Sequence, residues 1–134
     1  MIVVDANVMV AALISPTTQG DSARAAMYAD DDWLAPAHMP LEVLRTLRKA
    51  ALGGRAIPDD TNAAFHALSA MQITYVSIDI PLLQAVWAMR HNVSAYDAAY
   101  LAVAVMNDAP LITFDARLVK TAEQTVPNVQ VVVP

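Results

Sequence analysis

The sequence predicts an α/β fold: a three-layer α/β/α sandwich with a central, mostly parallel five-stranded sheet. Three observations support this prediction. Short apolar runs rich in Val and Ile alternate along the chain with segments of helical pattern. The runs are continuously apolar and do not alternate with polar residues, which is typical of strands buried on both faces. Turn residues separate the segments, so strands and helices follow one another as in repeated β-α units.

The predicted strands are five short apolar runs. The first is Ile-Val-Val, and it is expected to end at a polar turn formed by Asp5, Ala6 and Asn7. Two of the others contain Trp33 and Tyr75, and β-branched residues make up most of the rest. The five runs are residues 2–4, 33–35, 73–78, 111–113 and 129–133.

The predicted helices carry recognisable start and stop signals. Asp21 is expected to N-cap the helix that runs to Tyr28. Pro40 suits the first turn of a longer helix, and Gly53 with Gly54 ends it. The helical segments are residues 8–14, 21–28, 40–52, 58–71, 81–90, 94–106 and 116–124.

The composition excludes several classes of protein. The chain has 134 residues, of which 57% are apolar, and contains no cysteine. This length suits a single domain over residues 1–134, and the apolar content excludes a disordered chain. The lack of cysteine excludes a disulfide framework, a thiolate metal site and a cysteine nucleophile. No apolar stretch reaches the roughly 18 residues of a membrane span, and no signal peptide pattern is present, so a cytoplasmic protein without membrane association is expected.

The charge distribution is less decisive than the net charge. With 13 acidic and 8 basic residues the chain carries a formal charge of −5, which at first sight argues against a nucleic-acid partner. Metal ions bound by the acids would offset part of this charge. Most of the basic residues also lie in one part of the chain: Arg24, Arg45, Arg48, Lys49 and Arg55.

Four acidic residues are placed by the predicted elements at one edge of the sheet. Asp5 and Asp115 follow the first and fourth strands, whereas Glu42 and Asp97 lie in the first turns of two helices. Helices that follow parallel strands begin at the carboxyl edge, where ligands bind in open α/β sheets. We therefore expect the four carboxylates to converge, although no two are close in sequence.

Three of these acids also have a structural explanation. Asp115 is a suitable N-cap for the helix after it. Glu42 is favourable in a first turn and is spaced for an ion pair with Arg45. Asp97 forms, with Ser94, a pattern similar to a capping box.

Asp5 is harder to explain structurally, because a carboxylate directly after a central apolar strand is costly to bury without a partner. Asp97 lies at the start of a helix that is apolar on all sides, so it is expected to be partly desolvated too. No Lys or Arg is near either acid in sequence.

Clustered carboxylates repel one another, and oxygen-only ligands favour Mg²⁺ or Mn²⁺. Such ions activate water for phosphodiester hydrolysis.

The order and spacing of four segments resemble the PIN-domain nucleases, and most closely the VapC-type toxins of type II toxin–antitoxin pairs. The Tyr-Asp97-Ala-Ala-Tyr pattern is the most specific part, and the resemblance covers essentially the whole chain. The segments are Val-Val-Asp5-Ala-Asn7-Val, Pro40-Leu-Glu42-Val-Leu-Arg-Thr-Leu, Ser94-Ala-Tyr-Asp97-Ala-Ala-Tyr-Leu-Ala and Leu-Ile-Thr113-Phe-Asp115-Ala-Arg-Leu.

The resemblance implies a metal-dependent endoribonuclease that hydrolyses RNA with a metal-activated water and uses Mg²⁺ or Mn²⁺ as cofactor. It implies a central first strand, a homodimer, and a cognate antitoxin whose tail enters the active site. Asn7 and Thr113 match polar positions that support the acids. Some relatives carry a further acid three residues after the last one, where this chain has Leu118, which puts tight binding of a second metal in doubt. The catalytic and metal-binding acids would be Asp5, Glu42, Asp97 and Asp115.

Basic and histidine residues near these positions allow two interpretations. Arg45 and Lys49 share a helical face with Glu42, so they either bind RNA phosphates or form ion pairs on a solvated face. None of the histidines has a second histidine one turn away, so surface or boundary positions are expected for them. Of these histidines, His38 lies nearest to the predicted site; the others are His66 and His91.

Two alternative functions remain open from the sequence. One is a non-catalytic, metal-binding interaction module with the same fold. The other is a Mg²⁺-dependent phosphatase with Asp5 as phosphoryl acceptor, which would need a second acid where Asn7 stands. The sequence names neither the RNA nor the antitoxin, and oxygen ligands alone do not distinguish Mg²⁺ from Mn²⁺.

Overall fold

The fold is built on a five-stranded parallel sheet, and the computed structural model describes all 134 residues. The strand order is β3-β2-β1-β4-β5, and every neighbouring pair is parallel. The predicted α/β class and the central position of the first strand are thus confirmed, and the sheet is parallel throughout. The strands are β1 (Ile2–Val4), β2 (Trp33–Pro36), β3 (Ile73–Val76), β4 (Leu111–Ile112) and β5 (Val131–Val132).

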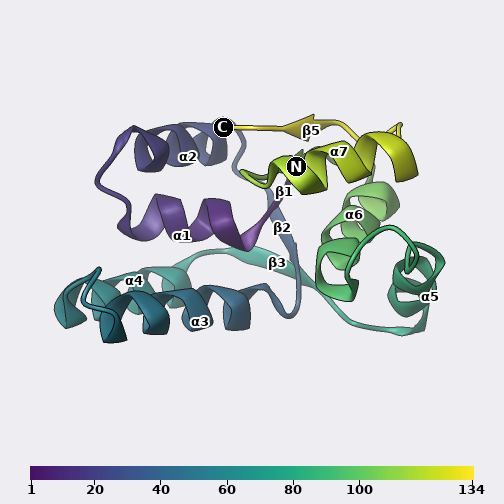
Figure 1. Cartoon of the computed structure of the whole chain (residues 1–134). Helices are drawn as coiled ribbons and strands as arrows, with labels where there is room; N and C mark the ends of the chain where they lie inside the picture. The colour runs from purple at the N-terminus through teal and green to yellow at the C-terminus, as the bar shows by residue number, and fades with distance from the viewer.

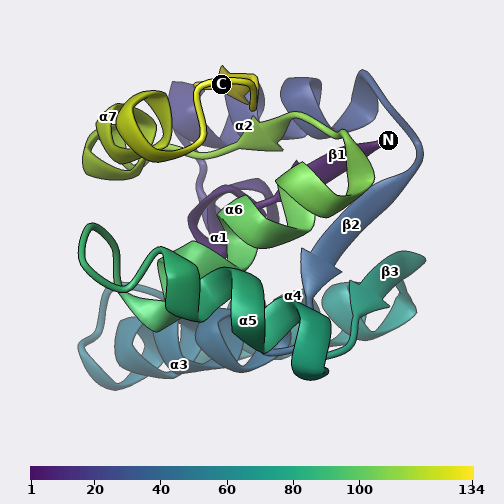
Figure 2. The same cartoon turned by 90° about the vertical axis from the view of Figure 1, so that its right-hand side faces the viewer.

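The helices form the outer layers. Figure 1 shows α1 to α4 on one side of the sheet and α5 to α7 on the other. In the view of Figure 2, α6 runs across the face of the sheet with α5 packed beside it. The helices are α1 (Ala6–Ile14), α2 (Thr18–Tyr28), α3 (Met39–Leu52), α4 (Pro58–Ala70), α5 (Ile80–Ala88), α6 (Ala95–Asn107) and α7 (Ala116–Thr125).

The edge strands are shorter than the sequence predicts. β3 ends at Val76 and not at residue 78, because Asp79 already N-caps α5 through a hydrogen bond from the Leu82 backbone N–H. In β5 only two residues pair with β4, although the apolar run is longer. An apolar run therefore marks the position of an edge strand but not its length.

The starts of the first two helices differ from the prediction. No polar turn follows β1, because α1 begins at Ala6 with Asp5 as its N-cap. The second helix begins at Thr18, so Asp21 lies within its first turn and does not cap it. The chain reverses between α1 and α2 with Gly20 buried against the backbone of Ser15.

The hydrophobic core joins the sheet to α6. A cluster of 29 buried apolar residues includes all of β1 and the middle of α6. The prediction that α6 is buried holds for Ala98 to Ala104, whereas Val105 and Met106 are exposed. The backbone N–H of Asp5 donates to the carbonyl of Ile112, so the ends of β1 and β4 lie side by side. No helix of the structure has the length and apolarity to cross a membrane.

Gly20→Ala is expected to destabilise the fold, because a Cβ at this position would lie 2.1 Å from the carbonyl oxygen of Ser15. Relieving such a clash requires a backbone shift, which costs about 1–3 kcal/mol or more. Chemical denaturation measures this difference in the free energy of unfolding. Gly54→Ala is the control: a Cβ there would meet open space, and only its φ of +68° is unfavourable. A loss at Gly20 no larger than that at Gly54 would contradict the proposed packing.

Candidate active site

The four predicted acids lie at the carboxyl edge of the sheet, on four different elements. Asp5 follows β1 directly, Glu42 and Asp97 stand in the first turns of α3 and α6, and Asp115 N-caps α7. Their charges are within electrostatic reach of one another. Glu42 and Asp97 both raise the pKa of Asp5, although burial raises it more. The fold therefore concentrates negative charge at the edge where ligands of parallel sheets bind.

Asp5 is oriented by a hydrogen-bond network between the ends of β1 and β4. Its Oδ2 accepts from the hydroxyl of Thr113 at 2.6 Å and from Nδ2 of Asn7 at 2.8 Å. Asn7 in turn accepts from the backbone N–H of Phe114, and the Thr113 hydroxyl accepts from the backbone N–H of Asp115. Asn7 and Thr113 thus fix the direction of the Asp5 carboxylate.

Burial dominates the electrostatics of Asp5. The residue is 7% exposed and makes no ion pair. Burial raises its pKa to about 6, even though the hydrogen bonds from Thr113 and Asn7 act in the opposite direction. At neutral pH Asp5 is therefore a buried carboxylate whose charge no protein cation neutralises.

Glu42 has different neighbours from those that the sequence suggests. Burial raises its pKa, but contacts with His38 and Tyr100 and the positive charge of Arg45 outweigh burial, so the pKa lies below its usual value. The Tyr100 hydroxyl donates to Oε1 at 2.9 Å, and Nε2 of His38 lies 2.8 Å from the same oxygen. The expected ion pair with Arg45 is not formed. Burial raises the pKa of Tyr100 well above its usual value, so its hydroxyl is a donor.

Asp97 and Asp115 share a cavity of about 320 Å³. Burial raises the pKa of Asp97, and the charges of Asp115 and Glu42 add to this effect. The structural explanations also apply: Ser94 accepts from the Asp97 backbone N–H, and Asp115 accepts from two N–H groups of α7. Arg117 lines the same cavity and partly offsets the charge of Asp97, a neighbour that sequence reasoning missed. Its only sequence signal is its place two residues after Asp115.

The remaining candidates lie outside this cluster. Arg45 and Lys49 are exposed on α3, and His66 and His91 are exposed on the surface. Leu118, where some relatives have an acid, is 2% exposed and packs in the core.

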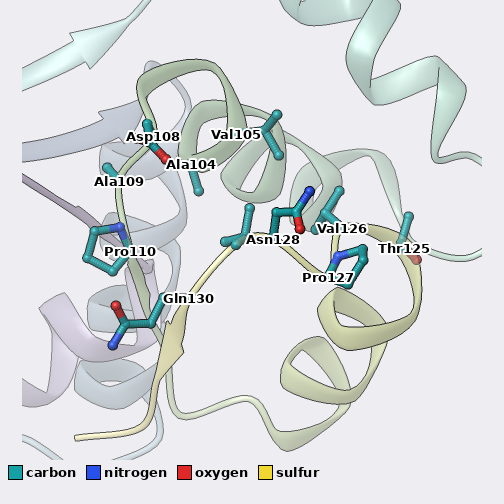
Figure 3. Close-up of a pocket in the computed structure, with 11 residues that line it drawn as sticks. Ala104, Val105, Asp108, Ala109, Pro110, Thr125, Val126, Pro127, Asn128 and Gln130 are labelled. Atoms are coloured by element: carbon teal, nitrogen blue, oxygen red, sulfur yellow. The ribbon is translucent and has the colours of Figure 1, made fainter.

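A larger cavity, of about 450 Å³, lies at the opposite edge of the sheet (Figure 3). It is bounded by the residues that precede β4 and β5 and by the C-terminal ends of α6 and α7. Asp108 is the only acid in its lining. Because this cavity lies at the amino ends of the strands and holds one acid, it does not share the chemistry of the acidic edge.

The acidic edge offers carboxylates to a divalent cation from separate elements of the fold. No group of three or more His, Asp or Glu side chains forms a ready ligand set in the structure. Mg²⁺, however, is commonly held by one or two carboxylates, with water completing its coordination. A buried, unpaired Asp5 beside two further acids fits an ion of this kind.

Comparison with known proteins places the chain in a family. The model of the PIN domain matches residues 2–124. Among curated proteins, Ribonuclease VapC9 of Mycobacterium tuberculosis is 31% identical over 127 residues, which are 95% of each chain. Ribonuclease VapC1 of the same organism is 37% identical over 84 residues, so the match spans 63% of this chain and 63% of that relative.

Solved structures share the fold at low sequence identity. The toxin VapC20 of Mycobacterium tuberculosis, described as cleaving the sarcin-ricin loop, has a TM-score of 0.67 at 18% identity and covers 90% of this chain and 94% of its own. VapBC2 from Rickettsia felis, solved with a DNA fragment from its promoter, has a TM-score of 0.69 at 12% identity, with 99% and 98% covered. From the family match over residues 2–124 and the match to VapC9 over 95% of both chains, the chain belongs to the PIN-domain family and is a VapC-type member of it.

Proposed function

We propose that this chain is a divalent-metal-dependent endoribonuclease, the toxin of a type II toxin–antitoxin pair. The observation that carries the proposal is Asp5, a buried carboxylate that Asn7 and Thr113 aim in one direction and that no protein cation neutralises. Keeping such a charge buried is costly, and a bound cation removes most of that cost. The ribonuclease names of the VapC relatives support the same activity.

The proposed cofactor is Mg²⁺ or Mn²⁺, held by carboxylates from the set Asp5, Glu42, Asp97 and Asp115. When bound, such an ion supplies a nucleophilic water and offsets charge on the leaving oxygen of a phosphodiester. Asn7 and Thr113 would not bind the ion themselves but would orient Asp5 toward it. Asn7 and Thr113 occupy one oxygen of Asp5, and this leaves Oδ1 with only a long contact of 3.4 Å to a backbone N–H.

The RNA backbone would be bound by basic side chains beside the acids. Arg117 lines the cavity that contains Asp97 and Asp115, whereas Arg45 and Lys49 are exposed on the helix that carries Glu42. Phosphate contacts of this kind hold and orient a nucleic acid without reading its sequence.

The proposed protein partners are a cognate antitoxin and a second copy of the chain. Structural neighbours from Klebsiella pneumoniae and Rickettsia felis were solved as toxin–antitoxin complexes, which supports the first partner. The second is supported by α5, where only Leu82 is buried. Ile80, Leu83 and Trp87 form an exposed apolar stripe on this helix, and such a stripe is typical of a protein–protein interface.

A phosphatase is disfavoured by the surroundings of Asp5. The position that would need a second acid holds Asn7, whose amide donates to Asp5 and accepts from Phe114. Because both ends of the amide are used, Asn7 has a defined positioning task. A non-catalytic module of the same fold is the outcome that the first experiment below distinguishes.

Cleavage of end-labelled RNA is expected to require Mg²⁺ or Mn²⁺ and to stop with EDTA. Asp5→Ala and Asp97→Ala are each expected to lower the rate by roughly 100-fold or more, the effect of losing one preorganised electrostatic contact. Asp60→Ala, an exposed acid in the first turn of α4, is the matched control and should cleave as the unsubstituted protein does. Undiminished cleavage by both site variants would overturn the proposal. Mn²⁺ binding without cleavage of any RNA would indicate the non-catalytic module.

Asp5→Asn is expected to stabilise the metal-free protein at neutral pH. The pKa of Asp5 is about 6 in the folded protein, whereas in the unfolded chain it has its ordinary value of 3.8. Between these values the native state holds more protons, so the free energy of unfolding falls as pH rises. The gain from Asn at about pH 7.5 is roughly 1–3 kcal/mol, measured by denaturation, and it should vanish near pH 4, where Asp5 is protonated. A gain that is equal at both pH values would contradict the assignment of the shift to Asp5.

Leu83→Glu is expected to shift the chain toward the monomer, because it places a charge in the exposed stripe of α5. Light scattering after size-exclusion chromatography measures the mass at several concentrations. Leu52→Glu is the control, since Leu52 is also an exposed leucine but ends α3. An unchanged dimer for Leu83→Glu, or a monomeric unsubstituted protein, would contradict self-association through α5.

A further inference from the structure

A polar junction between α3 and α6 joins Glu42 of the acidic cluster to two buried or half-buried side chains. It consists of His38, Glu42 and Tyr100, and we call it the α3–α6 junction. Tyr100 is 1% exposed, among the largest fully buried side chains of the protein. Its hydroxyl donates to Oε1 of Glu42 at 2.9 Å across a separation of 58 residues. A buried phenol needs a hydrogen-bond partner, and here the partner is one of the four acids.

His38 closes the junction from the start of α3. Its ring packs edge-on against Tyr96 and Tyr100, with centroid separations of 5.3 and 5.4 Å, and the side chain is 10% exposed. Nε2 lies 2.8 Å from the same Oε1 of Glu42. The ring N–H is not well directed at this oxygen, so the buried Nε2 has no hydrogen-bond partner of good geometry. The close contact is therefore electrostatic and steric, and it confines Oε1 from a second side.

The two oxygens of Glu42 consequently differ. Oε1 is held between Tyr100 and His38, whereas Oε2 makes no hydrogen bond or ion pair in the structure. A Glu side chain has several rotatable bonds, and fixing one oxygen limits the directions that the other oxygen adopts. The junction thus orients a flexible carboxylate in the way that Asn7 and Thr113 orient the shorter Asp5.

We propose that Tyr100 is a positioning residue that, together with His38, holds Oε1 of Glu42 and leaves Oε2 to bind the catalytic cation. The inference rests on the proposed function, and it assigns the task of arranging that site to the buried hydroxyl of α6. Partners that orient a metal-binding carboxylate commonly contribute about 10–100-fold to metal affinity.

Tyr100→Phe and Tyr96→Phe form a matched pair for the test. Both remove one hydroxyl from α6, and both rings contact His38, but Tyr96 is 65% exposed and its hydroxyl makes no hydrogen bond. Mn²⁺ affinity, measured by calorimetry on folded protein, is expected to fall by about 10-fold or more for Tyr100→Phe and to stay unchanged for Tyr96→Phe. The Mn²⁺ concentration for half-maximal RNA cleavage should rise by the same factor, with the rate recovered at saturating Mn²⁺.

A double-mutant cycle separates positioning from a general structural effect. In a Glu42→Ala background, Tyr100→Phe is expected to cause no further loss of Mn²⁺ affinity, because its effect passes through Glu42. His38→Asn removes the other contact to Oε1 and provides a second variant outside the core. Its Mn²⁺ affinity should fall as well.

The outcomes distinguish this inference from the proposed function. The positioning role is overturned if Tyr100→Phe and Tyr96→Phe have equal Mn²⁺ affinity, or if Tyr100→Phe still lowers the affinity in the Glu42→Ala background. In either case, Mn²⁺ binding and RNA cleavage by the unsubstituted protein would still uphold the proposed function. An unsubstituted protein that neither binds Mn²⁺ nor cleaves RNA overturns the function, and the inference with it.

Discussion

The hydrogen bonds that join Asp5 to Thr113 and Asn7 are the constraint on which the acidic edge depends. They tie the end of the central strand to the end of β4, and they continue the backbone contact between Asp5 and Ile112. Asp5 has two tasks at once, because it also N-caps α1 and so sets the direction in which that helix leaves the sheet. The same side chain therefore helps to shape the fold and supplies the most buried charge of the site.

The burial of these acids lowers the free energy of unfolding of the metal-free protein. Burial raises the pKa of Asp5 and of Asp97, and each of these acids is further disfavoured by its acidic neighbours. A protein selected for stability alone would place neutral residues there, as is common away from functional sites. The hydrogen bonds from Thr113 and Asn7 recover only part of the cost, since the pKa of Asp5 remains raised.

The fold was predictable from the sequence to the extent that it depends on local pattern. Alternating apolar runs and helices gave the parallel sheet, and the position of acids at element ends indicated the shared edge. Helix starts were less predictable. The chain needs no polar turn after β1 because the Asp5 side chain caps α1 directly, and Gly20 allows α2 to begin before Asp21.

The site was predictable in its acids but not in the contacts between them. The spacing of Glu42 and Arg45 suggested an ion pair, yet Glu42 instead contacts His38 one turn earlier and Tyr100 from a different helix. Local spacing cannot reveal a contact over 58 residues, which depends on how α6 packs against the start of α3. Arg117 was missed as well: its effect on Asp97 joins α6 and α7, whereas its 3.8 Å ion pair with Asp115 is local.

The long sequence separations within the site have a consequence for synthesis. The Thr113 hydroxyl reaches Asp5 across 108 residues, and the backbone of Phe114 reaches Asn7 across 107. Chains fold from the N-terminus as they leave the ribosome, and distant pairings form late. In a nascent chain that ends before β4, Asp5 has Asn7 beside it but lacks the Thr113 hydroxyl. The acidic edge is thus completed only after the segment that follows β4 has been synthesised and has packed against the end of β1.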